Sequence, residues 1–513
     1  ARRRAARLAP RPLVSLVCPV GEREVEAVAA TLASLRAQVY GEWELLLVED
    51  GGRGGRAAAP PGVEAERDPR VRLVAAPGAE GPAAVARGID AARGACLALL
   101  EPGAHLEPDA VFLLARAFAG AADLDVAYTD EDRLGADGRR RDPVFKPAWS
   151  PNLLLSTNYP GRLCAVRRGL AGGSADFTPG CDGAEAYDLV LRAAERARRI
   201  ERVPEVLYHG PPGRRPATEG GRRALQAALA RRDVDGLVGA VGPGRYRVRY
   251  PLAGAPLVSI VIPSRDRAAL LRACVASILD RSSYRGFEIV VADNGSREPG
   301  TLDYLRSIPP PHRALACPGE FNWSAINNLA AREARGEHLL FLNDDVEVLA
   351  PDWLEALLEH SQRPGVGAVG ARLLYPDGAV QHAGVVLGAE GFAGHPFRGL
   401  KPGAAGYDFL ASAVRDCSAV TGACMMVPRA AFRESGGFDE RLRQAFNDVD
   451  FCLRLRGRGY SVVYTPHAVL RHVESATRTG PVPRSEVLLA RRRWGALAAG
   501  ADSYDMADLS SAS

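Results

Sequence analysis

The stretch Pro256-Leu-Val-Ser-Ile-Val-Ile-Pro263 decides the fold, because the chain also contains it as Pro12-Leu-Val-Ser-Leu-Val-Cys-Pro19. Each copy is a short run rich in β-branched residues that ends at proline, a pattern typical of a buried strand. The spacing between the copies holds without a gap as far as a second apolar run, residues 44–50 in the first copy and 288–294 in the second. The repeat predicts two domains of the same fold.

Each copy continues with alternating strand and helix patterns. In the second copy, apolar residues three and four apart between Leu270 and Leu279 predict a helix, and another helix is expected over 324–334. The apolar run 339–342 then predicts a third strand. This alternation is typical of an α/β fold with an open, mostly parallel sheet, in which ligands lie at the carboxyl ends of the strands.

The predicted organisation is therefore two tandem α/β domains. Its parts are an N-terminal domain over 1–212, a linker with a helix and a strand over 213–255, a C-terminal domain over 256–484, and a C-terminal helix and tail over 485–513. The hydrophobic fraction of 47% and the charged fraction of 25% are those of a globular protein. The formal net charge of +4 on 513 residues does not predict a nucleic-acid groove.

Cysteine usage and the absence of long apolar runs predict the compartment. The nine Cys occur singly, without zinc-site spacing, and favour a reducing, cytoplasmic environment. No apolar run approaches the roughly 20 residues needed to span a bilayer. The basic start of the chain, residues 1–7, is interpreted as a solvated tail, with contact to the inner face of an anionic membrane as the alternative.

The two copies differ in the acidic residues that follow the third strand. The second copy has Asn343-Asp344-Asp345 where the first has Glu101-Pro102-Gly103. Adjacent carboxylates repel each other and are costly to bury unless a cation neutralises them. Oxygen ligands of this kind suit Mg²⁺ or Mn²⁺, ions that also hold substrate phosphates. The pattern predicts a divalent-cation site in the second copy alone.

Other polar residues follow predicted strands or begin a predicted helix. Asp293 ends the second strand, where it can form an Asx turn, accept hydrogen bonds from a nucleotide, or do both. In Phe446-Asn-Asp-Val-Asp-Phe451, carboxylates are favoured by the helix dipole, and one of them can also act as a general base. His472 is interpreted either as a packed side chain or as a contact to metal or phosphate.

Together these motifs resemble those of the bacterial double-domain family 2 glycosyltransferases of GT-A fold, which assemble surface polysaccharides such as O-antigen and rhamnan. The stretches that carry the resemblance are 256–264, 291–296, 341–348, 366–374, 381–386, 420–427 and 447–454 in the second copy, and 128–133, 145–155 and 187–192 in the first. The resemblance implies an inverting transfer from a nucleotide sugar, with dTDP-rhamnose as the family-level choice of donor. It implies a glycan or polyprenyl-linked acceptor and a Mg²⁺ or Mn²⁺ cofactor.

The resemblance also implies roles for particular residues. Asp448 falls at the position of the catalytic base, and Asp345 and His472 at positions that contact the metal. Asn343 replaces the more usual first acid of the metal motif. The residues expected to bind the donor are Pro263, Ser264, Asp293, Asn294 and Asp344. The residues expected to support the base or bind the acceptor are Asp450, Asn447, His382 and Trp323.

The first copy lacks most of these groups. Glu49 stands for Asp293, but no acidic pair follows the third strand, and Ala186 falls opposite Asp448. We therefore expect a degenerate transferase domain with a structural or acceptor-holding role. The alternative is a second activity that uses other acids, namely Asp130, Glu131, Asp132 and Asp188. The acids from Asp130 to Asp132 can also form an acidic turn.

Four other functions compete with a single-site transferase. A bifunctional transferase would need acids in both copies, and a non-catalytic glycan-binding scaffold would need them in neither. A membrane-embedded processive synthase is disfavoured, because Ala490 occupies the place of Gln in the usual Gln-x-x-Arg-Trp motif that would end at Arg493-Trp494. A nucleotidyltransferase is disfavoured because no Gly-rich, Lys-containing phosphate loop is present.

Overall fold

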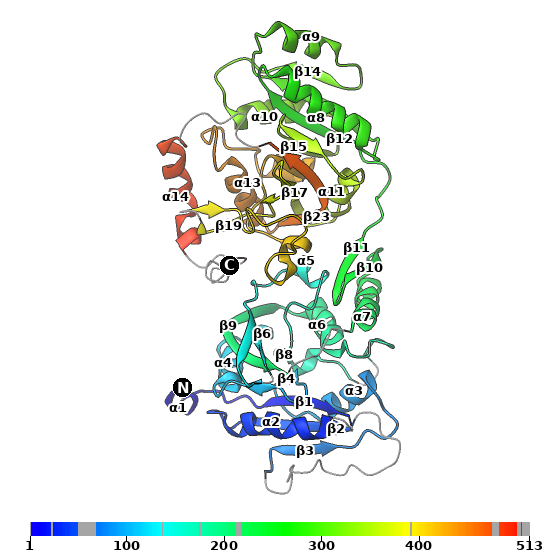
Figure 1. The fold of residues 1–513 in the computed structure, drawn as a ribbon. Helices are drawn as coiled ribbons and strands as arrows, with labels where there is room; N and C mark the ends of the chain where they lie inside the picture. The colour runs from blue at the N-terminus through cyan, green and yellow to red at the C-terminus, as the bar shows by residue number, and fades with distance from the viewer. Residues whose placement is uncertain are drawn as a thin grey trace. The chain divides into compact units, whose positions relative to one another are not determined.

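The computed structural model describes residues 2–21, 24–49, 68–135, 137–173, 176–211, 217–389, 392–473, 482–499 and Tyr504, so most of the predicted C-terminal tail lies outside the described residues. Its internal contacts divide the chain into two units, shown as a ribbon in Figure 1. The N-terminal unit consists of Ala1–Ser150 and Leu154–Arg249. The C-terminal unit consists of Pro151–Leu153 and Tyr250–Ser513.

Each unit contains a mixed, parallel-rich sheet. In the N-terminal unit the strands are β1 (Val14–Val20), β2 (Trp43–Glu49), β3 (Val71–Val74), β4 (Cys96–Leu99), β5 (His105–Leu106), β6 (Leu124–Leu134), β7 (Arg140–Val144), β8 (Cys164–Arg167) and β9 (Arg199–Gly210), followed by the hairpin β10 (Leu237–Gly242) and β11 (Arg245–Arg249). In the C-terminal unit they are β12 (Val258–Ser264), β13 (Phe287–Asp293), β14 (Arg313–Ala316), β15 (His338–Leu342), β16 (Val346–Val348), β17 (Val366–Leu374), β18 (Val380–His382), β19 (Val386–Leu387), β20 (Ala393–Gly394), β21 (Arg415–Asp416), β22 (Cys424–Pro428) and β23 (Ser461–His472).

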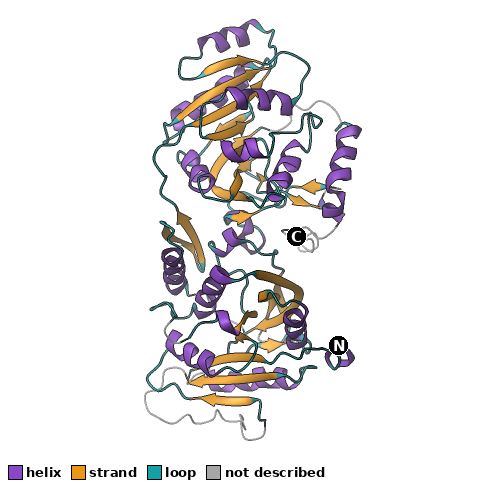
Figure 2. Cartoon of the chain, turned by 180° about the vertical axis from the view of Figure 1, so that it is seen from behind, coloured by secondary structure: helices purple, strands orange, loops and turns teal. Residues whose placement is uncertain are grey.

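The helices flank these sheets (Figure 2). The helices that belong to the N-terminal unit are α1 (Arg2–Ala5), α2 (Val25–Arg36), α3 (Pro82–Ala91), α4 (Ala110–Gly120), α6 (Glu185–Arg196) and α7 (Thr218–Arg231), with α5 (Pro151–Leu154) where the chain crosses between units. Those of the C-terminal unit are α8 (Ala268–Arg281), α9 (Pro299–Ser307), α10 (Trp323–Glu333), α11 (Trp353–Ser361), α12 (Arg429–Glu434), α13 (Asn447–Arg456) and α14 (Arg484–Ala499). None of the helices in the described ranges is both long and apolar enough to cross a membrane.

The two sheets have the same strand order, which confirms the predicted tandem α/β fold. The order is β3-β2-β1-β4-β8-β6-β9-β5 in the N-terminal unit and β14-β13-β12-β15-β22-β17-β23-β16 in the C-terminal unit. In each, the first four strands are parallel and the next one is antiparallel to them. Strands at the same place in the two orders can therefore be compared as internal counterparts.

A buried hydrogen-bonded cluster recurs at the same place in both sheets. In the C-terminal unit, Glu288 on β13 accepts hydrogen bonds from the hydroxyl of Ser259 at 2.7 Å and from the backbone N–H of Arg335 at 2.7 Å. In the N-terminal unit, Glu44 on β2 accepts the corresponding bonds from Ser15 at 2.7 Å and from the N–H of Arg93 at 2.6 Å. The repeat in the sequence is thus also a repeat of side-chain interactions that join adjacent parallel strands to the following loop.

Apolar residues cover both faces of the C-terminal sheet. Alternate residues of β12 point to opposite faces, as the pleat requires, so Ile260 and Ile262 join one cluster and Val261 joins the other. The first cluster includes residues from α8 and α11, and the second includes residues from α10 and α13. With its faces covered, the sheet presents the ends of its strands, where the polar residues of the sequence motifs lie.

Candidate active site

Asp344 lies two residues after the end of β15, at the carboxyl edge of the parallel strands. Its carboxylate accepts a 2.7 Å hydrogen bond from the hydroxyl of Ser264, the last residue of the neighbouring strand β12. Both side chains are buried. Burial, followed by the negative charge of Asp345, raises the pKa of Asp344 although the Ser264 bond opposes this. The acidic pair is therefore held where negative charge is costly, as predicted from the sequence.

Asp345 is the most unusual member of this edge. Its side chain is 1% exposed, yet neither carboxylate oxygen receives a hydrogen bond. His472 ends β23 and pairs in register with Val346, which brings its Nε2 to 3.0 Å from Oδ1 of Asp345. At this distance the two atoms are close, but they are not aligned as donor and acceptor. A buried carboxylate without donors is what a cation-binding site needs.

The other ring nitrogen of His472 is fixed by Gln381 of β18. Nδ1 of His472 lies 2.6 Å from Oε1 of Gln381, which can only accept a hydrogen bond. The proton of a neutral His472 therefore resides on Nδ1, and Nε2, which carries the lone pair, lies 3.4 Å from the amide nitrogen of Asn343 and 3.0 Å from Oδ1 of Asp345. Metal-ligating histidines are oriented in the same way by an acceptor on their second nitrogen. A role for Gln381 could not be predicted from the sequence, since only the pairing of β17 with β18 places it here.

These residues fit a divalent cation that is completed by a substrate. Asp345 and His472 offer an oxygen and a nitrogen ligand, and Asp344 lies beside them. Within the described residues, no group of three His, Cys, Asp or Glu side chains has the arrangement of a complete metal site. Mg²⁺ and related ions are often held by one or two carboxylates together with substrate phosphates. The arrangement matches that type of site better than a structural metal site.

Asp293 is the last residue of β13 and Asn294 follows it, and both are held by local interactions. Oδ1 of Asp293 accepts bonds from the backbone N–H of Ser296 at 3.0 Å and from its hydroxyl at 2.5 Å, and Gly295 has a φ of +75°. The carboxylate therefore closes a local turn onto the third residue after it, one residue longer than the Asx turn that was one interpretation of the sequence. Asn294 is buried, and its amide donates to the backbone oxygen of Cys317 at 2.9 Å. Asn294 thus joins this turn to the segment after β14.

Asp448 lies in the first turn of α13, where the sequence placed a helix start. Its Oδ2 accepts a 3.0 Å hydrogen bond from the backbone N–H of Gly422, in the loop before β22. The next residue of that loop, Ala423, accepts a hydrogen bond from the N–H of Asn343 at 3.1 Å. The loop therefore lies between Asp448 and the acidic pair after β15. Asp448 is half-buried and retains access to solvent.

Trp323 packs over the same loop at the start of α10. A Cβ atom on Gly422 would lie 2.8 Å from the indole ring of Trp323, so only glycine fits there without displacement. The ring also contacts Phe438 edge-on, with centroids 4.8 Å apart. Trp323 thus forms part of the wall next to Asp448, although the sequence alone did not place it beside Gly422.

The remaining predicted residues are held within the protein. His382 is buried, its Nδ1 lies 2.8 Å from Nδ1 of His395, and burial lowers its pKa well below the usual value. The side-chain oxygen of Asn447 accepts a bond from the N–H of Asp448 at 2.9 Å. Asp450 is buried and bonded to arginines. Pro263 is half-buried and precedes Ser264 at the end of β12.

Comparisons with known proteins decide the family. A family model described as "Glycosyl transferase family 2" matches residues 259–434. The chain is 30% identical over 228 residues to the N-acetylglucosaminyl-diphospho-decaprenol L-rhamnosyltransferase of Mycobacterium tuberculosis, covering 41% of this chain and 73% of that protein. The chain belongs to glycosyltransferase family 2. The resemblance inferred from the motifs is confirmed.

Two longer proteins resemble nearly the whole chain. It is 42% identical to the O-antigen biosynthesis protein RfbC of Myxococcus xanthus over 95% of this chain and 40% of that protein. It is 42% identical to the uncharacterized protein y4gI of Sinorhizobium fredii over 95% of this chain and 56% of that protein. The glycosyltransferase chain thus spans about half the length of these relatives.

Solved structures similar to parts of this glycosyltransferase have low overall similarity. One is a crystal structure of GalNAc-T7 with UDP, GalNAc and Mn²⁺, with a TM-score of 0.40 and 16% identity, covering 50% of this chain and 52% of that chain. Another is the mannosyltransferase PcManGT from Pyrobaculum calidifontis in complex with GDP-Man and Mn²⁺, with a TM-score of 0.32 and 17% identity, covering 49% of this chain and 79% of that chain.

The corresponding edge of the N-terminal unit of this glycosyltransferase contains internal ion pairs. Glu101, the counterpart of Asn343, pairs with Arg162. His209 pairs in register with His105 as His472 does with Val346, but its Nδ1 contacts Asp132.

Other acids of this unit are also bonded to cations of the unit itself. Lys146 is buried and bonds Glu131 at 2.9 Å, and Arg202 bonds both oxygens of Asp130. The acids from Asp130 to Asp132 lie within β6, so the predicted acidic turn is wrong. A carboxylate that already has a protein cation as its partner is not free to bind a metal.

Proposed function

We propose that the C-terminal unit is a divalent-metal-dependent, inverting glycosyltransferase and that the N-terminal unit is a degenerate copy with a structural role. The observation that carries the proposal is the buried carboxylate of Asp345, which lacks hydrogen-bond donors and lies 3.0 Å from the ring nitrogen of His472. The internal comparison supports it, since the same edge of the N-terminal unit contains Lys146, Arg162 and Arg202 paired with acids.

The residues at the carboxyl edge of the C-terminal sheet would have different roles in such a transfer. Asp345 and His472 would hold Mg²⁺ or Mn²⁺, which when bound neutralises charge on the leaving diphosphate. Ser264 orients Asp344 beside this position, and the turn at Asp293 offers a carboxylate to the nucleoside. The proposed donor-binding residues therefore come from three adjacent strand ends.

Asp448 is the proposed general base. One of its oxygens is fixed by the N–H of Gly422, so its orientation is set by the loop before β22. A carboxylate there can take the proton from an acceptor hydroxyl as that hydroxyl attacks the sugar. Attack on the face opposite the departing diphosphate inverts the anomeric carbon. Asp450, whose carboxylate is already bonded to arginines, supports this helix and does not carry the proton.

The proposed substrates follow the names of the relatives. The Mycobacterium tuberculosis relative is named for L-rhamnosyl transfer to N-acetylglucosaminyl-diphospho-decaprenol, and the Myxococcus relative for O-antigen biosynthesis. We carry over a nucleotide-activated sugar, with dTDP-rhamnose tested first, and a polyprenyl-linked or polysaccharide acceptor. The reaction would then take place at the cytoplasmic face of a membrane.

The test is a transfer assay with separate measurement of donor binding. The protein is incubated with Mn²⁺, a panel of nucleotide sugars and a polyprenyl-diphosphate-linked acceptor, and products are identified by mass spectrometry. Asp448→Asn should lower kcat by roughly 10²- to 10⁴-fold and leave donor binding intact. Asp303→Asn, an exposed change on α9, is the control and should behave as wild type. An Asp448→Asn variant with full activity would refute the role of the base.

A further inference from the structure

We propose that α14 belongs to the active site, with Glu486, Arg493 and Trp494 as positioning residues for Asp448. The proposal rests on the proposed role of Asp448 as the base. None of the three residues touches the reacting atoms; they act through the turn that precedes α13 and through Asp450. α14 lies outside the segment that matches the family model, which ends at residue 434.

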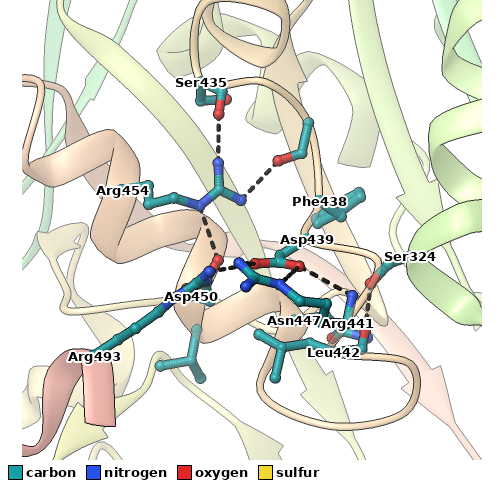
Figure 3. A network of polar contacts seen from close by, with 12 residues as sticks. Ser324, Ser435, Phe438, Asp439, Arg441, Leu442, Asn447, Asp450, Arg454 and Arg493 are labelled. Atoms are coloured by element: carbon teal, nitrogen blue, oxygen red, sulfur yellow. Dashed lines mark hydrogen bonds and ion pairs between the residues drawn. The ribbon is translucent and has the colours of Figure 1, made fainter. Parts of the chain in front are cut away.

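The first contact is made at Asp450, which lies two residues after the proposed base on the same helix. Figure 3 shows this carboxylate between arginines from two helices. Oδ2 accepts a 2.8 Å bond from Arg454 of the same helix. Oδ1 accepts a 2.8 Å bond from Arg493 and a 3.0 Å bond from the indole N–H of Trp494, both on α14. Charge-assisted bonds of this kind are shorter and stronger than neutral ones, so α14 is fixed to α13 at its first turn.

The second contact is made at the turn that leads into α13. Glu486 is 2% exposed, and its Oε2 accepts bonds from the backbone N–H groups of Gln444 at 3.0 Å and Ala445 at 2.8 Å. The next residue, Phe446, has a φ of +58°. That region is unfavourable for a bulky side chain and persists only where surrounding structure enforces it. Glu486 supplies this enforcement immediately before the turn of helix that carries Asp448.

Arg493 also makes a third contact, at Asp439. Its second terminal nitrogen lies 2.6 Å from Asp439, which is bonded in turn to Arg441. Contacts from α14 thus hold the segment 439–450 at Asp439, at Gln444 and Ala445, and at Asp450. Asp448 lies within this segment. Loss of one of these contacts would release the turn without removing any residue that binds the donor.

The N-terminal unit provides an internal comparison. Asp188 and Arg192 on α6 form an ion pair at 3.0 Å, as Asp450 and Arg454 do on α13, so this pair belongs to the fold in both copies. The other oxygen of Asp188 accepts a 2.6 Å bond from Thr178 in the segment just before α6. In the C-terminal unit the other oxygen of Asp450 is bonded by α14. The C-terminal unit, which contains the proposed base, is thus the unit in which α14 bonds the carboxylate of Asp450.

The experiment compares neighbouring arginines of α14 in the full chain. Arg493→Gln should lower kcat by about tenfold or more, because small displacements of a catalytic group are costly, while KM for the donor stays within about twofold. Arg493→Lys, which keeps the charge, should recover part of the loss. Arg492→Gln removes an exposed arginine from the same helix and should match wild type.

Glu486 gives a second, independent pair of variants. Glu486→Ala removes the acceptor for two backbone N–H groups and should lower kcat as Arg493→Gln does, whereas Glu486→Gln keeps an acceptor oxygen and should retain most activity. Mn²⁺-dependent binding of the donor is measured for each variant and should be unchanged. Equal kcat for Arg493→Gln and Arg492→Gln, or parallel loss of donor binding and kcat, would overturn the proposal.

Asp448→Asn is assayed alongside to keep the two proposals apart. If Asp448→Asn is inactive while Arg493→Gln and Glu486→Ala are fully active, the inference about α14 fails and the proposed function stands. If Asp448→Asn is fully active, the proposed function itself fails. A loss in Asp448→Asn together with a kcat-specific loss in the α14 variants supports both.

Discussion

At the scale of single residues, the unpartnered carboxylate of Asp345 is the feature that most needs explanation. Buried polar groups are nearly always hydrogen-bonded, and a buried charge without a partner costs several kcal/mol or more. Its neighbour His472 has its lone pair directed inward by Gln381. On the proposed function, a residue arranged in this way lowers the stability of the metal-free protein and serves to bind the cation.

Asp345→Asn should therefore stabilise the metal-free protein while removing its response to Mn²⁺. The amide carries no charge to desolvate. We expect the unfolding transition of the C-terminal unit to rise by about 2–4 °C for each kcal/mol gained. Calorimetry with and without Mn²⁺ measures both effects. A lower Tm without metal, or a Mn²⁺-induced rise equal to that of wild type, would contradict this explanation.

The candidate residues could be found in the sequence, but their partners could not. Asp345 follows a strand and Asp448 lies at the start of a helix, and both positions can be recognised from local patterns. Gln381 and Arg493 reach the site from segments far away in the sequence, and no local pattern reports which partner they meet. The roles of the predicted site residues stay predictions until they are assayed.

At the scale of elements, the repeated pairing of a serine and a glutamate helps three of the four parallel strands keep their register in each unit. In the C-terminal unit these strands are β12, β13 and β15. Ser259 and Glu288 lie on adjacent strands, and their bonds also reach the loop before β15. The strand and helix order could be predicted because apolar periodicity reports it. The position of Asp130 to Asp132 within β6 could not, since three consecutive charged residues favour a turn unless tertiary ion pairs support a strand.

These glutamates should make both units sensitive to acid. Burial alone would raise the pKa of Glu288, but the bonds from Ser259, Arg335 and Arg313 outweigh it and lower the pKa below 4.5. The pKa of Glu44 is lowered in the same way. A depressed folded-state pKa stabilises the protein above the unfolded value, and this contribution is lost as pH falls through the folded pKa.

Glu288→Gln should therefore lower stability at neutral pH and weaken the decline in stability of the C-terminal unit below about pH 4.5. Denaturant unfolding followed from pH 7 to pH 3 checks the slope, with Glu44→Gln as the matched variant in the other unit. An unchanged acid slope in both variants would show that these carboxylates do not control acid unfolding.

At the scale of the whole molecule, the duplication separates what the fold requires from what the reaction requires. Both units keep the strand order, the serine–glutamate cluster and the aspartate–arginine pair of the helix before the last long strand. Only the C-terminal unit has the acidic pair after its fourth parallel strand, β15, and an aspartate at the place of Ala186. The proposed reaction therefore needs one site in each chain.

The most direct test of this central claim is the stoichiometry of donor binding to the full chain. Titration calorimetry is carried out in Mn²⁺ with the nucleotide sugar that supports transfer, on wild type and on Asp345→Asn. The account predicts one donor bound for each chain of wild type and none for Asp345→Asn. Two donors bound for each chain, or one donor still bound by Asp345→Asn, would contradict it.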